Sequence, residues 1–382
     1  MVGGSVGYLL FSLCLAALVY QIMALICGAR FFQDEPPRGS SSGPGVTIFK
    51  PLKGRDAFTR ECLESFLTQD YRPFQVLFGV ADRDDPVLPL LEELKGAYPE
   101  LDLEIHLCPE PLGLNPKISI LRQLEGRGRY DLLVISDGDV KVGPDFLSRT
   151  VAALQPGVGL VTCPYRAGGD SLGGALEALT IAADFIPSVA VAYYLEGIRF
   201  ALGAAMVIPR GVLQDIGGFA PLADFLADDY QLGWRVAQAG YGVQLIPYAV
   251  ETKNPSMTLK DYLLHQLRWT RTYRVCRPKG YLAYGITHAL IYALAFLMIS
   301  GSSPLAWGLV GATLLLRGSL AWLYQRVWLK GEMPAGALLL LPVKDLLAFG
   351  LWLLSFLGNR VTWQHRGFRV TPEGKLVSGV GS

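Results

Sequence analysis

The chain has 382 residues, of which 51% are hydrophobic and 18% are charged, and its mean hydropathy is +0.33. This composition excludes an ordinary soluble protein, and we expect part of the chain to lie in a bilayer. The formal net charge of +1 gives no overall field for nucleic acid, so we expect no nucleic-acid partner. The six cysteines form no C-x-x-C pair, which argues against a disulfide framework and against a zinc site.

The N-terminal segment predicts a transmembrane anchor, which we place over residues 1–29. Residues 7–27 are an almost unbroken apolar run without charge, long enough to cross a hydrocarbon core of about 30 Å. A signal peptide is the alternative, but no basic residue precedes the run. Arg30 and Arg38 follow the run, which places the next domain in the cytoplasm. The content of Ala, Gly, Leu and Arg favours a bacterial inner membrane over the Golgi.

An α/β domain follows a linker over residues 30–45 that is rich in Pro, Gly and Ser. Runs of strand type alternate there with segments of helix type. The expected strands are residues 46–49, 74–80, 103–107 and 132–136, and the expected helices are residues 57–68, 86–97 and 116–124. This alternation predicts a doubly wound, mostly parallel sheet, and we assign residues 46–257 to it.

A second membrane region is expected over residues 281–358. Residues 281–299 and 304–324 are two candidate spans joined by an uncharged turn. An amphipathic helix at the membrane interface is expected just before them, over residues 258–280.

The last apolar stretch, residues 335–357, is interrupted by Pro342, Lys344 and Asp345. Each of these charges costs about 2.5–3.5 kcal/mol near the middle of a bilayer. We therefore expect the chain to fold back at this point as a re-entrant hairpin or a pair of interfacial helices. The basic tail, residues 359–382, then lies in the cytoplasm.

Acidic residues follow two of the expected strands, and ligands of open α/β sheets bind beyond the carboxyl ends of strands. Asp82 follows residues 74–80, and Asp137 and Asp139 follow residues 132–136. Two carboxylates separated by a glycine can converge on a divalent cation, although Asp and Gly are also ordinary turn formers. Mg²⁺ or Mn²⁺ held there would neutralise the diphosphate leaving group of a nucleotide-sugar.

Two more acids, Asp228 and Asp229, precede an expected helix over residues 231–239. They suit an N-cap that benefits from the helix dipole. Alternatively, one of them is the general base that takes the proton from an attacking hydroxyl. Both interpretations stay open on the residues alone.

The amphipathic helix carries His265, Arg268 and Trp269 on one face, because they are spaced at i, i+3 and i+4. Arg268 can donate two parallel hydrogen bonds to a diphosphate. The alternative is an interfacial helix whose basic residues meet lipid phosphates and whose Trp lies at headgroup depth.

Taken in order, these features resemble the D, D, D, (Q/R)xxRW series of the inverting GT-A glycosyltransferases, specifically the ceramide glucosyltransferase family. The matching segments are residues 80–86, 137–139, 227–230 and 265–269, with residues 49–54 and 113–117 also similar. The bacterial hopanoid-associated glycosyltransferases share them. The resemblance runs from about residue 46 to residue 269. It implies an α/β GT-A (nucleotide-diphospho-sugar transferase) domain between an N-terminal transmembrane anchor and C-terminal membrane helices.

The resemblance also implies how a UDP-sugar donor is bound. The residues expected to contact it are Pro51, Lys53, Asp82, Lys117, Asp137 and His265. Among these, Asp82 is expected to recognise the uridine. Asp137 and Asp139 are expected to hold the Mg²⁺ or Mn²⁺ ion beside the diphosphate.

The same resemblance implies that Asp229 is the catalytic base and that Arg268 and Trp269 close over the diphosphate and the acceptor. One position departs from the family motif: His265 stands where Gln or Arg is usual. A histidine there can still donate a hydrogen bond. The apolar residues 175–194, between the expected metal and base motifs, are a candidate floor or gate for a lipid.

The activity implied is transfer of a hexose, glucose, from a UDP-sugar to the hydroxyl of a membrane lipid such as ceramide, with inversion. Transfer of N-acetylglucosamine from its UDP derivative to a hopanoid remains an alternative, as does a polyprenyl-phosphate sugar transferase. A processive polysaccharide synthase needs more spanning helices than this chain offers. A non-enzymatic adaptor is expected to have lost some of these acids, and all are present.

Overall fold

The computed structural model describes residues 4–168, 171–253, 256–363 and 366–378. The chain divides into two compact units, and each is described by itself. The helical unit comprises Met1–Gln33, Arg166–Glu196 and Ser256–Glu373. The sheet unit comprises Asp34–Tyr165, Gly197–Pro255 and Gly374–Ser382. Apolar residues 166–196, expected inside the α/β domain, therefore group with the helical unit.

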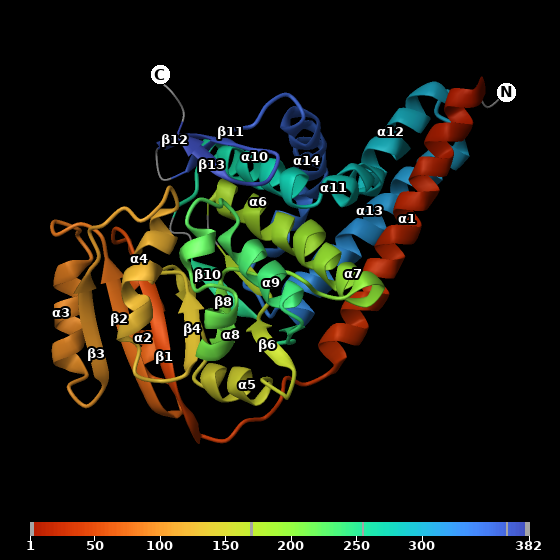
Figure 1. Ribbon diagram of the computed structural model, residues 1–382. Helices are drawn as coiled ribbons and strands as arrows, with labels where there is room; N and C mark the ends of the chain where they lie inside the picture. The colour runs from red at the N-terminus through yellow and green to blue at the C-terminus, as the bar shows by residue number, and fades with distance from the viewer. Residues whose placement is uncertain (1–3, 169–170, 254–255, 364–365, 379–382) are drawn as a thin grey trace. The chain divides into compact units, whose positions relative to one another are not determined.

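The sheet unit is built on seven strands in the order β3-β2-β1-β4-β8-β6-β9 (Figure 1). Their bounds are β1 (Ser42–Leu52), β2 (Arg72–Val80), β3 (Asp102–Leu107), β4 (Leu132–Ser136), β6 (Val158–Thr162), β8 (Ala205–Pro209) and β9 (Gly242–Leu245). Strands β3, β2, β1 and β4 are parallel, as predicted, whereas β8 runs antiparallel to both β4 and β6. A short antiparallel pair, β5 (Val140–Lys141) and β10 (Val250–Lys253), follows β4.

Both faces of this sheet are buried, which explains the continuous apolar strands. The helices are α2 (Thr59–Leu67), α3 (Leu88–Ala97), α4 (Pro116–Leu124), α5 (Phe146–Ala152), α8 (Arg210–Asp215) and α9 (Asp228–Gln238). Phe49 and Leu77 join the core that α4, α8 and α9 complete on one face. On the next residue of β1, the fully buried Lys50 points to the other face, where its ammonium lies 3.8 Å from the ring centroid of Phe66 in α2.

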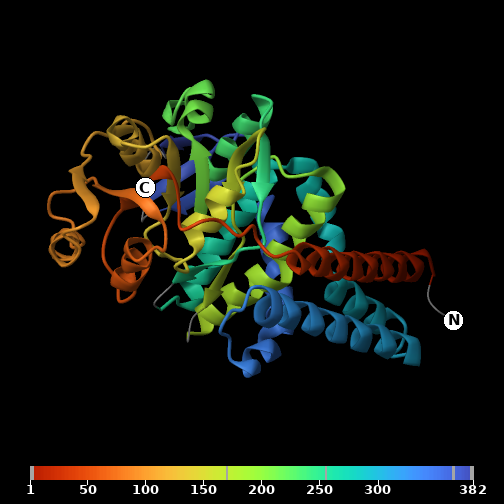
Figure 2. The same cartoon turned by 90° about the horizontal axis from the view of Figure 1, so that it is seen from below.

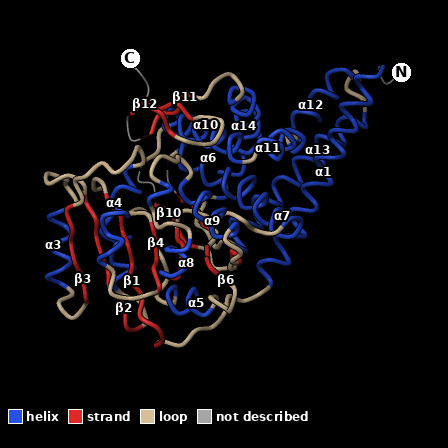
Figure 3. Tube along the Cα trace, viewed as in Figure 1, coloured by secondary structure: helices blue, strands red, loops and turns tan. Residues whose placement is uncertain are grey.

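The helical unit contains the long apolar helices (Figures 2 and 3). The bounds are α1 (Gly4–Gln33), α6 (Leu172–Thr180), α7 (Ile186–Glu196), α10 (Leu259–Cys276), α11 (Pro278–Tyr284), α12 (Ala289–Ile299), α13 (Pro304–Trp322) and α14 (Leu341–Ser355). A π-helical turn, Ile181–Phe185, joins α6 to α7. Strands β11 (Arg360–Trp363) and β12 (Arg366–Val370) pair antiparallel in this unit. Strand β13 (Leu376–Ser378) belongs to the sheet unit, and β7 (Tyr165–Gly168) begins at the last residue of one sheet-unit segment and continues in the helical unit.

Four helical segments of the described residues are long and apolar enough to cross a membrane. They are Gly4–Gln33, Leu172–Glu196, Pro304–Trp328 and Gly336–Ser355. The expected N-terminal anchor and the span after Pro304 are among them. The expected span over residues 281–299 is not one straight helix, because the chain bends by 48° between Pro278–Thr287 and Ala289–Ile299; this bent pair is a fifth candidate among the described residues if it counts as one span.

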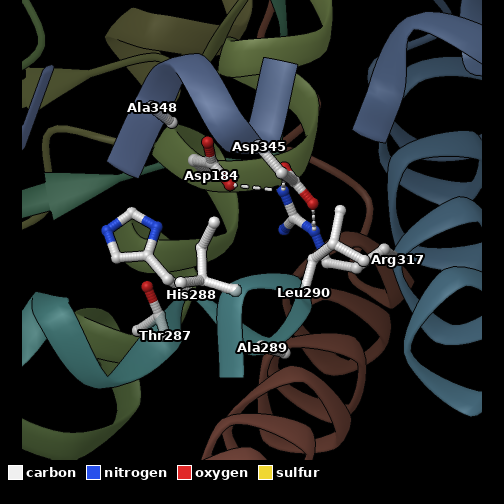
Figure 4. Close-up of a pocket in the computed structure, with 9 residues that line it drawn as sticks. Asp184, Thr287, His288, Ala289, Leu290, Arg317, Asp345 and Ala348 are labelled. Carbon is white, nitrogen blue, oxygen red and sulfur yellow. Dashed lines mark hydrogen bonds and ion pairs between the residues drawn. The ribbon is translucent and has the colours of Figure 1, made fainter. Parts of the chain in front are cut away.

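The fold-back predicted at residues 342–345 is also wrong, because α14 is one continuous helix. Pro342 lies in its first turn, where a missing N–H costs no hydrogen bond. Lys344 is fully buried and lies 2.9 Å from Asp345, and it also pairs with Asp184. Arg317 lies 2.8 Å from Asp184 and donates to Asp345 at 3.0 Å (Figure 4). These two cations and two anions cancel one another's charge, which removes the penalty that the fold-back was expected to avoid.

This four-residue ion cluster generates a stability prediction. Asp345→Asn leaves a buried excess positive charge, so we expect the free energy of unfolding in detergent to fall by about 3–5 kcal/mol. The double change Lys344→Met with Asp345→Leu keeps the charges balanced and should cost less than Asp345→Asn alone. Arg38→Gln, in an exposed pair with Glu35, serves as the control and should leave thermal unfolding unchanged. A double variant at least as unstable as Asp345→Asn would contradict the charge-balance explanation.

Candidate active site

Three segments that lie far apart in the sequence meet around Lys117 in the sheet unit. Its ammonium lies 2.7 Å from Oδ1 of Asp137 and 3.2 Å from Oδ2 of Asp228, and its side chain is 14% exposed. Lys117 is the second residue of α4, Asp137 follows β4 and Asp228 begins α9. The carboxyl end of β4 is therefore the place where the predicted acids gather. Burial opposes the charge of Lys117, but Asp137 and Asp228 raise its pKa above the usual value.

Asn115 fixes the start of α4, a role that the resemblance of residues 113–117 to the family does not specify. Its carbonyl oxygen accepts from the N–H of Ile118 at 3.1 Å, as an N-cap does. Its fully buried amide nitrogen donates to the carbonyl of Phe225 at 2.9 Å and to Asp228 at 3.2 Å. One side chain thus ties the beginning of α4 to the beginning of α9. An Asn-Pro pair at the start of a helix is the sequence signal that could have revealed it.

The loop of Asp137 is hydrogen-bonded to the buried ammonium of Lys50. The sequence does not predict this role of Lys50. The ammonium of Lys50 donates to the carbonyl of Asp137 at 2.6 Å and to the hydroxyl of Ser136 at 3.3 Å. Burial lowers the pKa of Lys50 to about 8. A Cβ at Gly138 would lie 2.8 Å from the end of the Leu52 side chain, so a larger residue there would have to displace Leu52. These contacts fix the orientation of the acidic loop.

Asp229 lies in the first turn of α9, where its Oδ1 accepts from the N–H of Tyr230 at 2.7 Å. A Cβ at Gly203 would lie 2.8 Å from its Oδ2, so the loop before β8 packs closely on the carboxylate. Burial and the neighbouring Asp228 raise the pKa of Asp229 to about 6, against the lowering effect of Lys117. The N-cap interpretation is not what the structure shows, because the N-cap is Ala227 and its side chain makes no capping bond.

Asp139 interacts electrostatically with Asp137, Lys50 and Lys117. Burial and Asp137 raise the pKa of Asp139 to about 6, while Lys50 and Lys117 lower it. Among the residues that the structure describes, no three His, Cys, Asp or Glu side chains form a group that could hold a metal ion. A divalent cation at Asp137 and Asp139 would need further oxygen ligands from a bound molecule.

The remaining predicted donor contacts lie on the same edge of the sheet. Pro51 is buried near the end of β1 and pairs in register with Gly79 of β2. Lys53 and Asp82 are exposed and follow those two strands. The carboxylate of Asp85, which sequence reasoning did not single out, is buried and accepts from the N–H of Gly54 at 3.0 and 2.9 Å. It ties the loop of Lys53 to that of Asp82.

His265, Arg268 and Trp269 lie in the helical unit, on α10. A capping box between Thr258 and Asp261 begins this helix. The rings of His265 and Trp269 are 4.7 Å apart between centroids, as expected for neighbours on one helix face.

Comparison with known proteins decides the family. The model of Glycosyl transferase family 21 matches residues 9–376. The chain belongs to this family. Membership confirms the resemblance to ceramide glucosyltransferases that the ordered motifs indicated.

Relatives of this chain include Ceramide glucosyltransferase 3 of Caenorhabditis elegans, 24% identical over 355 residues that cover 88% of this chain and 75% of the relative. The ceramide glucosyltransferase of Komagataella phaffii is 38% identical over 115 residues, which cover 29% of this chain and 23% of the relative. Among solved structures, a mannosyltransferase from Pyrobaculum calidifontis in complex with GDP-Man and Mn²⁺ has a TM-score of 0.54 and 19% identity, covering 89% of this chain and 99% of that one. This likeness confirms the predicted GT-A type of fold.

The contacts of Asn115 generate a prediction for the site of this family 21 protein. Asn115→Asp keeps the capping acceptor but replaces the donor to Asp228 with a second carboxylate. We expect the free energy of unfolding at neutral pH to fall by about 1–3 kcal/mol, because a buried polar contact is lost. Gln155→Glu makes the same amide-to-acid change at an exposed position and should have little effect. If Asn115→Asp is as stable as the wild type, Asn115 is only a helix cap.

Proposed function

We propose that this protein transfers glucose from UDP-glucose to the primary hydroxyl of a membrane lipid, with ceramide as the acceptor class and with inversion at the anomeric carbon. The observation that carries the proposal is the position of Asp229 beside the carboxylates that Lys117 neutralises. Membership of family 21 and the names of the relatives support the choice of a glucosyl donor and a ceramide acceptor.

In this proposal Asp229 is the general base. A carboxylate whose pKa is raised to about 6 is ionised at neutral pH and still accepts a proton readily. The lipid hydroxyl gives its proton to Asp229 while its oxygen bonds to the anomeric carbon from the face opposite UDP. The bond from that carbon to the diphosphate oxygen breaks, and UDP leaves with the electron pair. Asp228 is less suited to this role, because Lys117 and Asn115 already occupy its oxygens.

The donor diphosphate is expected to lie near Asp137, Asp139 and Lys117. Two partly buried carboxylates at one loop suit a hard divalent cation, Mg²⁺ or Mn²⁺, whose remaining ligands would be diphosphate oxygens. Such an ion supplies Lewis-acid stabilisation of the leaving group. Lys117 adds a fixed positive charge of the protein's own. Pro51, Lys53 and Asp82 would line the uridine side.

Arg268, Trp269 and His265 are proposed to close over the diphosphate and the acceptor. The candidate spans support an integral membrane protein. Arg30 and Arg38, after the N-terminal span, favour a catalytic domain in the cytoplasm of a bacterial inner membrane, and the basic residues of the tail, residues 359–382, favour the same side for the tail. Residues 364–365 and 379–382 of that tail lie outside the described part of the chain.

The test is a transfer assay with the purified protein in nanodiscs. Labelled UDP-glucose, UDP-N-acetylglucosamine and GDP-mannose would each be offered with ceramide, a hopanoid polyol or a polyprenyl phosphate. We expect a glucosylated ceramide whose anomeric proton coupling shows the β configuration. A product with another acceptor would replace ceramide in the proposal, and retention of configuration or the absence of any lipid product would contradict it.

The role of the base predicts that Asp229→Asn loses transfer while UDP binding stays within about threefold. General base catalysis contributes about 10²–10⁴-fold to rate, so kcat should fall by that factor. Asp215→Asn removes an acid that is hydrogen-bonded to Tyr241 in the same unit and should keep wild-type turnover. Near-normal turnover by Asp229→Asn would disprove this assignment.

The raised pKa of Asp229 predicts the pH dependence of catalysis. The base works only when ionised, so kcat/KM should rise with pH through about 6 and then level off. Below that value the carboxyl is protonated and cannot accept the proton of the acceptor. Lys117→Met should move this limb to higher pH, because the lysine lowers the pKa of Asp229. A profile that stays flat down to pH 5 would contradict the role of Asp229.

A further inference from the structure

Glu177 is a buried acid in a largely apolar helical segment. Its side chain is 3% exposed, and the segment Leu172–Glu196 is apolar enough to cross a membrane. The second acid of this segment, Asp184, pairs with Arg317 and Lys344. Glu177 is instead held by α10, the helix that carries the H-x-x-R-W motif. A buried carboxylate is costly unless it is well partnered, so this placement needs an explanation.

Two consecutive residues of α10 contact the two oxygens of this carboxylate. Oε1 of Glu177 lies 3.2 Å from Nδ1 of His265, and the buried amide of Gln266 donates to Oε2 at 2.7 Å. Nδ1 of His265 is itself buried, at a separation typical of an ion pair and without the alignment of a full hydrogen bond. One turn away on both helices, the hydroxyl groups of Thr180 and Tyr262 are 3.0 Å apart.

The chemistry of the pair restricts the imidazole. An ionised carboxylate only accepts hydrogen bonds, so the ring nitrogen beside it carries a proton. Gln266 fixes the carboxylate, and the carboxylate in turn fixes which nitrogen of His265 is protonated. Nε2 is then the ring nitrogen that remains for a ligand.

The same apolar segment also contacts the next motif residue. The ring of Phe185 lies 5.4 Å from that of Trp269, and Trp269 packs on His265 at 4.7 Å between centroids. Phe185 follows Asp184, which the ion cluster holds. The segment therefore contacts His265 through the carboxylate of Glu177 and Trp269 through the ring of Phe185.

We propose that Glu177 is a positioning residue for the H-x-x-R-W motif: its buried carboxylate holds the Nδ1 proton of His265 and so leaves Nε2 as the ring nitrogen that contacts a ligand. The role of the motif itself rests on the proposed function. The proposal also accounts for the unusual residue at this position. A glutamine carries its donors and acceptor on one amide, whereas a histidine needs a second residue to select its protonated nitrogen.

The kinetic test compares Glu177→Gln with Thr180→Val. Both changes remove a buried polar contact between α6 and α10, but only the first touches His265. We expect kcat/KM of Glu177→Gln to fall about tenfold, a usual size for coupled neighbours, and that of Thr180→Val to stay within about twofold. In a His265→Gln background, Glu177→Gln should cost less than about twofold, because the residue to be positioned is gone. Equal losses in both backgrounds would overturn the proposal.

The second test determines which ring nitrogen of His265 carries the proton, and it does not depend on activity. ¹⁵N chemical shifts of labelled histidine, assigned with His265→Gln, report which ring nitrogen is protonated. We expect a protonated Nδ1 in the wild type and in Thr180→Val, and a shift of the proton toward Nε2 in Glu177→Gln. A wild-type His265 with a bare Nδ1 would overturn the proposal. If the wild type transfers no sugar but shows the expected shifts, the proposed function fails while the positioning contact stands.

Thermal unfolding separates positioning from folding in these variants. Glu177→Gln and Thr180→Val should unfold at similar temperatures, since each loses one buried polar contact. Glu177→Asp, which keeps the charge, should recover part of the lost kcat/KM. If Glu177→Asp recovers no activity and Glu177→Gln alone is strongly destabilised, Glu177 is only structural.

Discussion

The ammonium of Lys117 between Asp137 and Asp228 is the interaction on which the site depends. Several acids gather at one edge of the sheet, and at short range like charges repel unless a cation lies among them. Lys117 supplies that cation from α4, while Lys50 secures the loop of Asp137 from beneath. With this arrangement the fold can keep Asp229 partly buried, and hence raise its pKa to about 6, without an uncompensated cluster of charge.

Much of this edge could be predicted from the sequence, because parallel strands bring their carboxyl ends to one side. The positions of Asp82, Asp137 and Asp139 followed from that rule. The pairing of Lys117 with Asp228 did not, since it depends on how α4 packs against α9, two helices that lie far apart in the sequence. The cation of Lys50 was equally hidden. The sequence of an apolar strand does not show which groups the ammonium of a lysine within it will contact.

For the membrane segments the sequence predicts a penalty that the structure does not have. The cost of burying a charge in a bilayer applies to an isolated charge, and these charges are paired. Lys344 and Asp345 looked too costly for a continuous helix, and the predicted hairpin followed from that cost. Asp184 and Arg317 lie far away in sequence, yet they neutralise both residues. Such pairing is a property of tertiary packing, and neither hydropathy nor local charge counts contain it. The position of Glu177 beside His265 escaped prediction for the same reason.

The central claim is that the acids around Lys117 form a nucleotide-sugar site that works with a divalent cation. Calorimetric titration of UDP into the purified protein, with Mn²⁺ and then with EDTA, tests it most directly. The account predicts tight UDP binding that needs the cation and is lost in Asp139→Asn, with transfer abolished by EDTA and restored by Mg²⁺ or Mn²⁺. Equal UDP binding with and without the cation, together with full transfer activity in EDTA, would contradict it.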